Sequence, residues 1–272
     1  MANERGLVFV HIPKTGGTTL RTIVDRQYPR RAMFWSDGPQ DVARLVALPE
    51  EARRRLLVVQ GHVQYGVHEH LFVPVDYITM LRRPVELVTS LYYFIRRRWP
   101  ERIREQTKDL SLAEFAARPF YMVRNLQTRA ISGMEQVDEA ALERAKANLR
   151  SGMVAFGLTE RFDESVLYFS QVLGWRNTFY RVRNVTRRPR RDVASEEAAA
   201  IIAAHNTLDR ELYAFATRIF EERIARQAPE FQDELRAFRR ANPVRGRLTD
   251  AYRRVRWGVP RRIGRLLGRA SR

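Results

Sequence analysis

The residues best suited to chemistry lie near the start of the chain, in the run Pro-Lys-Thr-Gly-Gly-Thr-Thr at residues 13–19. Glycines let a backbone curl close to a ligand, and hydroxyl groups and the first amides of a helix can donate hydrogen bonds to an anion. Lys14 precedes both glycines, whereas the lysine of the common nucleotide-triphosphatase motif follows the last glycine. The run therefore predicts a different kind of phosphate-binding loop, and its alternative is an ordinary turn with a solvated lysine. The expected phosphate ligands are Lys14, Thr15, Gly16, Gly17, Thr18 and Thr19.

A second candidate anion site combines an arginine with a serine. Arg82 follows a short apolar run, Pro84 comes two positions later, and Ser90 lies eight positions after the arginine. A guanidinium group offers forked donors to phosphate. A helix that begins at Pro84 would bring the Ser90 hydroxyl back toward the same anion. The pair predicts a second phosphate site, and the alternatives are a surface ion pair for the arginine and an inert position for the serine.

His62 is the candidate general base. It follows an apolar run that ends at Gln60-Gly61, and the carboxyl ends of parallel strands form the edge at which α/β sheets bind ligands. Histidine side chains ordinarily titrate at a pH of ~6.5, which suits proton abstraction from a hydroxyl group. The alternative is a buried histidine bonded to the backbone. His68 and His70 have no third strong ligand near them in the sequence, so we expect no metal site.

Short apolar runs precede each of these candidate residues and indicate the elements that position them. We expect strands over residues 7–10, 56–60, 77–81 and 153–158. A helical pattern follows the runs at 7–10, 77–81 and 153–158, which is the punctuation of strand, loop and helix. The repetition predicts an α/β protein with a parallel sheet flanked by helices. Apolar spacing over residues 196–241 predicts a helical C-terminal part.

Composition limits the possible chemistry. The 272 residues include no cysteine, which excludes disulfides, thiolate zinc sites and a cysteine nucleophile. No run approaches the ~20 apolar residues of a membrane span, and the first ten residues do not have the pattern of a secretory signal. We therefore expect a cytoplasmic protein of bacterial type.

The net charge of +18 predicts attraction to polyanions, and it is unevenly distributed. Residues 243–272 hold ten arginines and one aspartate, which leaves nine positive charges, half of the total. We therefore divide the chain into a catalytic domain at 1–242 and a basic amphipathic C-terminal tail at 243–272. The tail is expected to lie on the anionic inner face of a membrane, with a solvated segment that binds nothing as the alternative.

Both anion motifs, taken in order, resemble those of the sulfotransferases that use 3′-phosphoadenosine 5′-phosphosulfate (PAPS). The resemblance is to the branch of heparan sulfate and uronyl 2-O-sulfotransferases and their bacterial relatives. It implies the sulfotransferase version of the P-loop-like α/β fold and PAPS as the sulfuryl donor. Lys14 matches the lysine that stabilises the leaving 5′-phosphate, and Arg82 and Ser90 match the 3′-phosphate ligands. This chain departs from the family pattern at Arg83, usually Asp or Asn, and at Gln60, a histidine in the 2-O-sulfotransferases.

Two later segments are also similar to bacterial members of this family. Asn125 and Arg129 are four residues apart, so on a helix they share a face, and we expect both to point into one cleft and hold the acceptor or its sulfate. By resemblance, Thr186 and Arg187 belong to the late loop that closes over the nucleotide near its 3′-phosphate. The alternative for that second segment is a basic solvated loop.

The sequence thus predicts an enzyme, a PAPS-dependent O-sulfotransferase in which His62 removes the acceptor proton during in-line attack on sulfur. The resemblance implies a carbohydrate or glycolipid acceptor, and nucleic acid is not an expected partner. A sulfuryl group carries less charge than a phosphoryl group, so this scheme requires no metal. Two alternatives stay open: a kinase, which would need ATP, magnesium and carboxylates to hold the ion, and a polyanion-binding module without catalysis.

Overall fold

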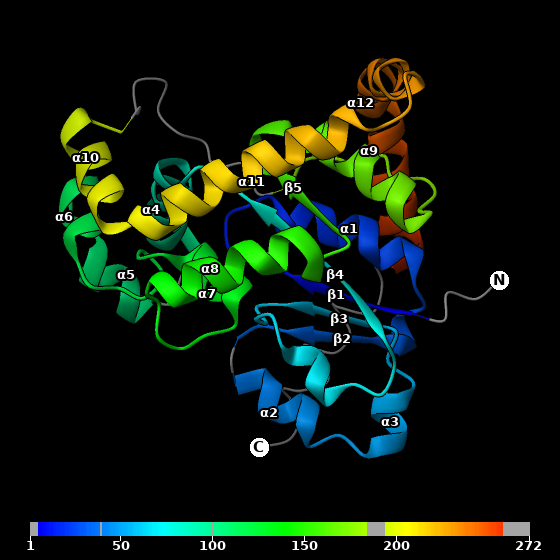
Figure 1. Ribbon diagram of the computed structural model, residues 1–272, viewed down its shortest axis with the longest axis horizontal. Helices are drawn as coiled ribbons and strands as arrows, with labels where there is room; N and C mark the ends of the chain where they lie inside the picture. The colour runs from blue at the N-terminus through cyan, green and yellow to red at the C-terminus, as the bar shows by residue number, and fades with distance from the viewer. Residues whose placement is uncertain (1–4, 39, 99–100, 184–193, 258–272) are drawn as a thin grey trace.

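Five parallel strands form one sheet at the centre of the part of the chain that the computed structural model describes, namely residues 5–38, 40–98, 101–183 and 194–257 (Figure 1). Their order across the sheet is β2-β3-β1-β4-β5, and every neighbouring pair is parallel. The strands are β1 (Gly6–Val10), β2 (Met33–Ser36), β3 (Val58–Gly61), β4 (Val75–Leu81) and β5 (Ala155–Leu158).

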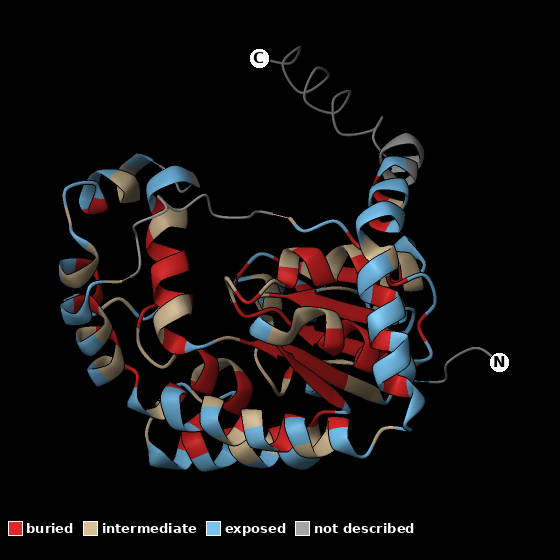
Figure 2. Ribbon diagram, turned by 90° about the horizontal axis from the view of Figure 1, so that it is seen from above, coloured by how far each residue is buried: buried red, intermediate tan, exposed pale blue. Residues whose placement is uncertain are grey.

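Helices surround this sheet and carry most of the exposed residues, while the strands are buried at the centre (Figure 2). Every residue of β1, β3 and β5 is buried, as expected for parallel strands covered on both faces. The helices are α1 (Gly17–Gln27), α2 (Gln40–Val46), α3 (Glu50–Arg54), α4 (Pro84–Arg98), α5 (Glu101–Thr107), α6 (Leu112–Ala117), α7 (Leu126–Ser132), α8 (Glu139–Ala147), α9 (Phe162–Leu173), α10 (Glu196–His205), α11 (Thr207–Ala225) and α12 (Glu230–Trp257). Shorter helical turns are η1 (Arg30–Ala32), η2 (Val67–His70), η3 (Asn148–Gly152) and η4 (Thr159–Arg161).

The predicted fold class is confirmed as an α/β protein with a parallel sheet flanked by helices and a helical C-terminal part. All four expected strands are present, with bounds shifted by one or two residues, and α4 begins at Pro84 as predicted. Strand β2 was not predicted. It has only four residues, lies at one edge of the sheet, and alternates between partly buried and buried positions.

A buried carboxylate joins α11 to the start of α7. Asp209 is 1% exposed and accepts hydrogen bonds from the Gln127 and Thr128 N–H groups at 3.0 and 2.7 Å, and from the Thr128 hydroxyl at 2.8 Å. In return, the Asn125 side-chain oxygen accepts from the Asp209 N–H at 3.1 Å. Because a carboxylate at a helix N-terminus satisfies amides that the helix cannot, this contact fixes where α7 begins.

Helix α12 runs through residue 243 without interruption, with Pro243 inside it. One face of the helix, at Asn242, Gly246 and Asp250, packs against the segment at 180–183. The Asn242 side chain accepts from the Tyr180 N–H at 2.9 Å, and buried Asp250 forms an ion pair with Arg183. The proposed domain boundary at 243 stays a prediction, and residues 258–272 of the tail lie outside the described residues.

The outer face of the same part of α12 carries exposed apolar residues beside arginines, as expected of a basic amphipathic tail. Val244 and Leu248 are 64% and 65% exposed, and exposed Arg240 and Arg247 lie beside them. None of the described helices has both the length and the apolar character needed to cross a bilayer. Membrane contact through the tail stays a prediction.

The packing of α12 predicts that replacing one helical glycine, Gly246, with alanine destabilises the protein. A Cβ at Gly246 would overlap the Tyr180 carbonyl group, which is backbone and cannot rotate away. Gly246→Ala should therefore lower the free energy of unfolding by about 1–3 kcal/mol, although the same exchange in an exposed helix usually raises it by about 1 kcal/mol. Urea denaturation measures the change. The control is Ala237→Gly at an exposed position of the same helix, which should lower the free energy of unfolding by about 1 kcal/mol. Stabilisation by Gly246→Ala would contradict the packing described.

Candidate active site

The carboxyl ends of three adjacent strands bring the predicted residues together. The loop at 13–17 follows β1, His62 follows β3, and Arg82 follows β4. Around them lies a cavity of about 460 Å³, here called the basic cavity. Its lining is His11, Pro13, Lys14, Gly16, Gly17, Thr18, His62, Arg82, Glu86, Ser90, Phe94, Thr159, Val182 and Arg183.

The loop after β1 has the shape of an anion cradle. Lys14 and Gly16 both adopt left-handed backbone conformations, with φ of 69° and 83°. No side chain caps the N-terminus of α1, and Gly16, Gly17 and Thr18 at that end line the basic cavity. A helix start with uncapped amides is suited to binding an anion.

Two threonines of the predicted ligand set support the loop instead of lining the cavity. The Thr15 hydroxyl donates to the Ile12 carbonyl at 2.8 Å, and the Thr19 hydroxyl accepts from the Arg183 N–H at 3.0 Å. Both side chains are buried, and neither lines the cavity. Of the six loop residues predicted as ligands, the structure brings four to the cavity.

The anchor of Arg82 was missed by sequence reasoning. Fully buried Gln127 accepts from the Arg82 N–H at 2.8 Å and donates to the Arg82 carbonyl at 2.9 Å. The Arg82 guanidinium also donates to the Lys14 carbonyl at 2.9 Å. Gln127 lies within the Asn-Leu-Gln-Thr-Arg segment singled out in the sequence. Only the two ends of that segment, Asn125 and Arg129, were predicted as site residues.

The remaining polar wall of the basic cavity comes from α4 and the late part of the chain. Ser90, 3% exposed, lines the cavity from α4 as predicted. Arg183, in the segment at 180–183, also lines the cavity, and its guanidinium forms an ion pair with the Asp250 carboxylate of α12. Thr159 follows β5, and its hydroxyl oxygen lies 2.8 and 2.9 Å from the carbonyl oxygens of Thr15 and Leu81. A search of every strand end would have found Thr159, whereas nothing in the sequence joins Arg183 to Asp250.

A second cavity of about 680 Å³ adjoins the first, and His62 lines both. His11, Pro13 and Phe94 are the other shared lining residues. The ammonium group of Lys14 lies 4.0 Å from the centre of the Phe94 ring, which places the lysine beside the boundary between the cavities. His62 can therefore contact one ligand in each cavity.

Hydrogen bonding determines which nitrogen of His62 can accept a proton. The Nδ1 atom of His62 lies 2.9 Å from the His11 carbonyl oxygen. A carbonyl oxygen only accepts, so Nδ1 carries the hydrogen, and in the neutral ring Nε2 holds a lone pair. This is the tautomer that a general base requires.

His11 lies beneath the cradle, and its ring contacts both Gly17 and His62. A Cβ at Gly17 would overlap this ring, which explains the glycine at that position. The ring stacks on His62 with 4.9 Å between centroids. Burial and, to a smaller extent, the charges of His62, Arg21 and Lys14 lower the pKa of His11 to about 3.

The structure separates the two residues predicted to hold the acceptor. Asn125 caps α7 in a left-handed conformation, its side chain bonds to the Asp209 N–H, and it lines neither cavity. The expectation of a shared cleft was wrong because α7 begins only after Asn125. Arg129 does line the second cavity and donates to the Glu135 carbonyl at 2.6 Å. Thr186 and Arg187 lie outside the described residues.

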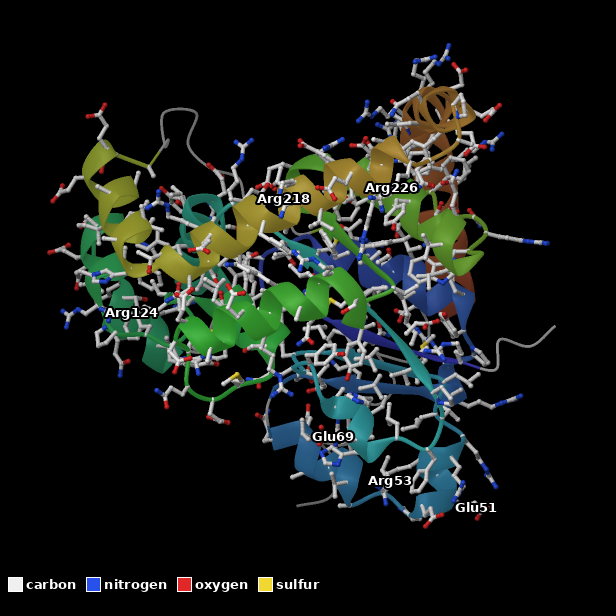
Figure 3. The ribbon with its side chains drawn as sticks, in the orientation of Figure 1. Glu51, Arg53, Glu69, Arg124, Arg218 and Arg226 are labelled. Atoms are coloured by element: carbon white, nitrogen blue, oxygen red, sulfur yellow. The ribbon has the colours of Figure 1, made fainter. Side chains whose placement is uncertain are left out.

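Exposed and half-buried charged groups away from the cavities account for part of the high charge content. The six side chains labelled in Figure 3 line neither cavity. Among the described residues, Glu139, Glu143 and Glu211 form the one group close enough to hold a cation, and Lys146 already bonds to Glu143 and Glu211 at 2.6 and 2.5 Å. The absence of a metal from the chemistry stays a prediction.

Comparisons with known proteins add little beyond this geometry. No family model and no curated protein matches the chain. Among solved structures, the chain is similar to mouse sulfotransferase SULT7A1 complexed with PAP, with 16% sequence identity and a TM-score of 0.37. The alignment covers 92% of this chain and 90% of that one. Similarity at that level establishes no shared activity, so the function must be argued from the site.

The lowered pKa of His11 predicts that acid destabilises the protein. The unfolded chain binds a proton at His11 near pH 6.5, whereas the folded chain does so only near pH 3, so stability is lost as the pH falls below 6.5. Between pH 7 and pH 5 this residue should cost about 2 kcal/mol. His11→Gln, which cannot take up a proton, should lose that much less stability over the same interval in urea denaturation. Equal losses for the wild type and the variant would show that His11 does not resist protonation.

Proposed function

We propose that this protein transfers a sulfuryl group from PAPS to a hydroxyl group of a carbohydrate acceptor. The observation that carries the proposal is the basic cavity, which brings the loop at Lys14 together with Arg82 and Ser90 and has His62 in the wall that it shares with a second cavity. The cradle at Lys14 suits a 5′-phosphosulfate, and Arg82 with Ser90 suits a 3′-phosphate. The motif resemblance makes the same assignment of each position.

The charges of the basic cavity support an anionic nucleotide and disfavour the kinase alternative. Lys14, Arg82 and Arg183 line it against one described carboxylate, Glu86. That carboxylate lies 3.7 Å from the Arg82 guanidinium, so an arginine already neutralises it. A kinase site needs carboxylates free to hold magnesium.

In the proposed mechanism, His62 acts on the acceptor and the cradle acts on the leaving group. Bound PAPS supplies an activated sulfuryl group, whose sulfur forms a bond to the acceptor oxygen as its bond to the 5′-phosphate oxygen breaks. Nε2 of His62 takes the hydroxyl proton, because Nδ1 is committed to the His11 carbonyl. Lys14 and the first amides of α1 stabilise the negative charge that develops on the departing phosphate.

The test of the donor site is calorimetric binding of 3′-phosphoadenosine 5′-phosphate, the desulfated product. The wild type should bind it in preference to adenosine 5′-phosphate and to ATP with magnesium. Arg82→Ala should weaken binding about 10- to 100-fold, because it removes charge-assisted hydrogen bonds to phosphate. Arg54→Ala, which removes an exposed arginine paired with Glu50, is the control and should bind like the wild type. Preference for ATP with magnesium would overturn the proposal.

The test of the base is His62→Asn. The asparagine amide can keep the hydrogen bond to the His11 carbonyl, but it has nothing in place of Nε2. Release of the desulfated product from PAPS, with methyl β-glucopyranoside as acceptor, should fall about 10²- to 10⁴-fold. Binding of that product should stay close to the wild-type value. His205→Asn, at the end of α10, serves as the control. Full turnover by His62→Asn would mean that another group removes the proton.

A further inference from the structure

The two cavities that meet at His62 differ in charge. Three cationic side chains and one carboxylate line the basic cavity, whereas the second cavity is lined by Arg129 against two carboxylates, Asp37 and Glu135. With histidines counted as neutral, the described lining of the second cavity is therefore negative by one charge. The surplus of positive charge that marks this chain as a whole is absent from that lining.

An acidic sugar polymer is a poor fit to such a lining. Each uronic acid or sulfate group of a polymer would meet two carboxylates and a single arginine. That arginine already donates to the Glu135 carbonyl. Like charges repel across a cavity more strongly than in bulk water, because the surrounding protein screens them less.

Apolar side chains form much of the second cavity's wall. Tyr121, at 60% exposure, is the most open of the large apolar residues lining it, while Val63 and Leu126 continue into the hydrophobic core. Apolar surface of this extent gains free energy when a ligand covers it. The lining also includes apolar Val42, Val67, Leu91 and Met122.

Neutral polar side chains occur in the same cavity. Gln40 and Gln64 line it, and a carboxamide can both donate to and accept from a hydroxyl group. An uncharged sugar hydroxyl can use both the donor and the acceptor of such a glutamine. A carboxylate on the ligand only accepts, so it would leave the glutamine oxygen without a partner. Since His62 lines this cavity too, a sugar held here has a base within the same wall.

From this we infer that the acceptor is an uncharged amphipathic glycoside: a sugar whose hydroxyl meets His62, joined to an apolar group that covers the aliphatic wall. The inference rests on the proposed sulfuryl transfer and makes it more specific. It narrows the carbohydrate or glycolipid acceptor that the motif resemblance implies to an uncharged sugar that carries an apolar group. In the transfer step, the glycoside oxygen gains the sulfuryl group, its proton passes to His62, and the desulfated nucleotide leaves.

Three matched probes separate charge from apolar surface: octyl β-glucopyranoside, octyl β-glucuronide and methyl β-glucopyranoside. The first two differ only at C6, where a carboxylate replaces the hydroxymethyl group, and the first and third differ only in the length of the alkyl chain. Binding to the full chain saturated with 3′-phosphoadenosine 5′-phosphate is measured by calorimetry below micelle-forming concentrations. Octyl glucoside should bind at least about tenfold more tightly than either of the others. Product release from PAPS should follow the same order.

Two variants test the cause of each preference. Asp37→Asn with Glu135→Gln should raise the affinity for octyl glucuronide relative to octyl glucoside by about threefold to tenfold. Met122→Gln should reduce the advantage of octyl glucoside over methyl glucoside. Glu139→Gln, an exposed carboxylate on α8 outside the cavity, is the control for charge and should keep the wild-type ratio.

Failure of this inference differs from failure of the proposed function. Suppose that the wild type binds 3′-phosphoadenosine 5′-phosphate but binds octyl glucuronide as tightly as octyl glucoside, or more tightly. The acceptor class is then wrong, and the proposed sulfuryl transfer stands. Binding of none of the three glycosides by the nucleotide-saturated protein would also overturn the acceptor class. If the nucleotide itself does not bind, the proposed function fails first.

Discussion

At the carboxyl edge of the sheet, the N–H group of His11 donates to the Gly61 carbonyl at 2.8 Å, and the Thr79 hydroxyl donates to the Val10 carbonyl at 2.8 Å. These bonds align the ends of β3, β1 and β4. The cradle, His62 and Arg82 follow directly from those three ends, so their spacing is determined by strand register and not by loop flexibility. Groups placed on a rigid framework in this way need little reorganisation when a ligand binds.

His11 connects the base to the cradle within this framework. Its carbonyl oxygen fixes the tautomer of His62, while its ring occupies the space that a side chain at Gly17 would need. Burial and, to a smaller extent, the charges of His62, Arg21 and Lys14 lower the pKa of its ring, so the ring remains neutral and adds no charge under the cradle. One residue therefore contacts both the His62 ring and the start of α1 at Gly17.

Sequence reasoning found what local pattern encodes. Each predicted strand carried a run of apolar residues, and the glycines around Lys14 and the proline after Arg82 gave clear boundaries. Strand β2 carries only a short apolar run, Met33-Phe34-Trp35, and as an edge strand it buries only alternate residues. Contacts over long sequence separation were also invisible: Gln127 reaches Arg82 only because Asp209, a further 82 residues along, fixes the start of α7.

The late part of the chain determines how the basic cavity is closed on one side. Arg183 reaches it because the segment at 180–183 lies against one face of α12, where Asn242 binds the Tyr180 amide and Gly246 allows close approach. Asp250 then holds the guanidinium from a buried position, which is expensive for a carboxylate unless a positive group accompanies it. The same ion pair therefore satisfies the buried charge and places a cation at the cavity wall. On this argument, residues before and after 243 contribute together to one site, and charge in this region has a structural use as well as any use at a membrane.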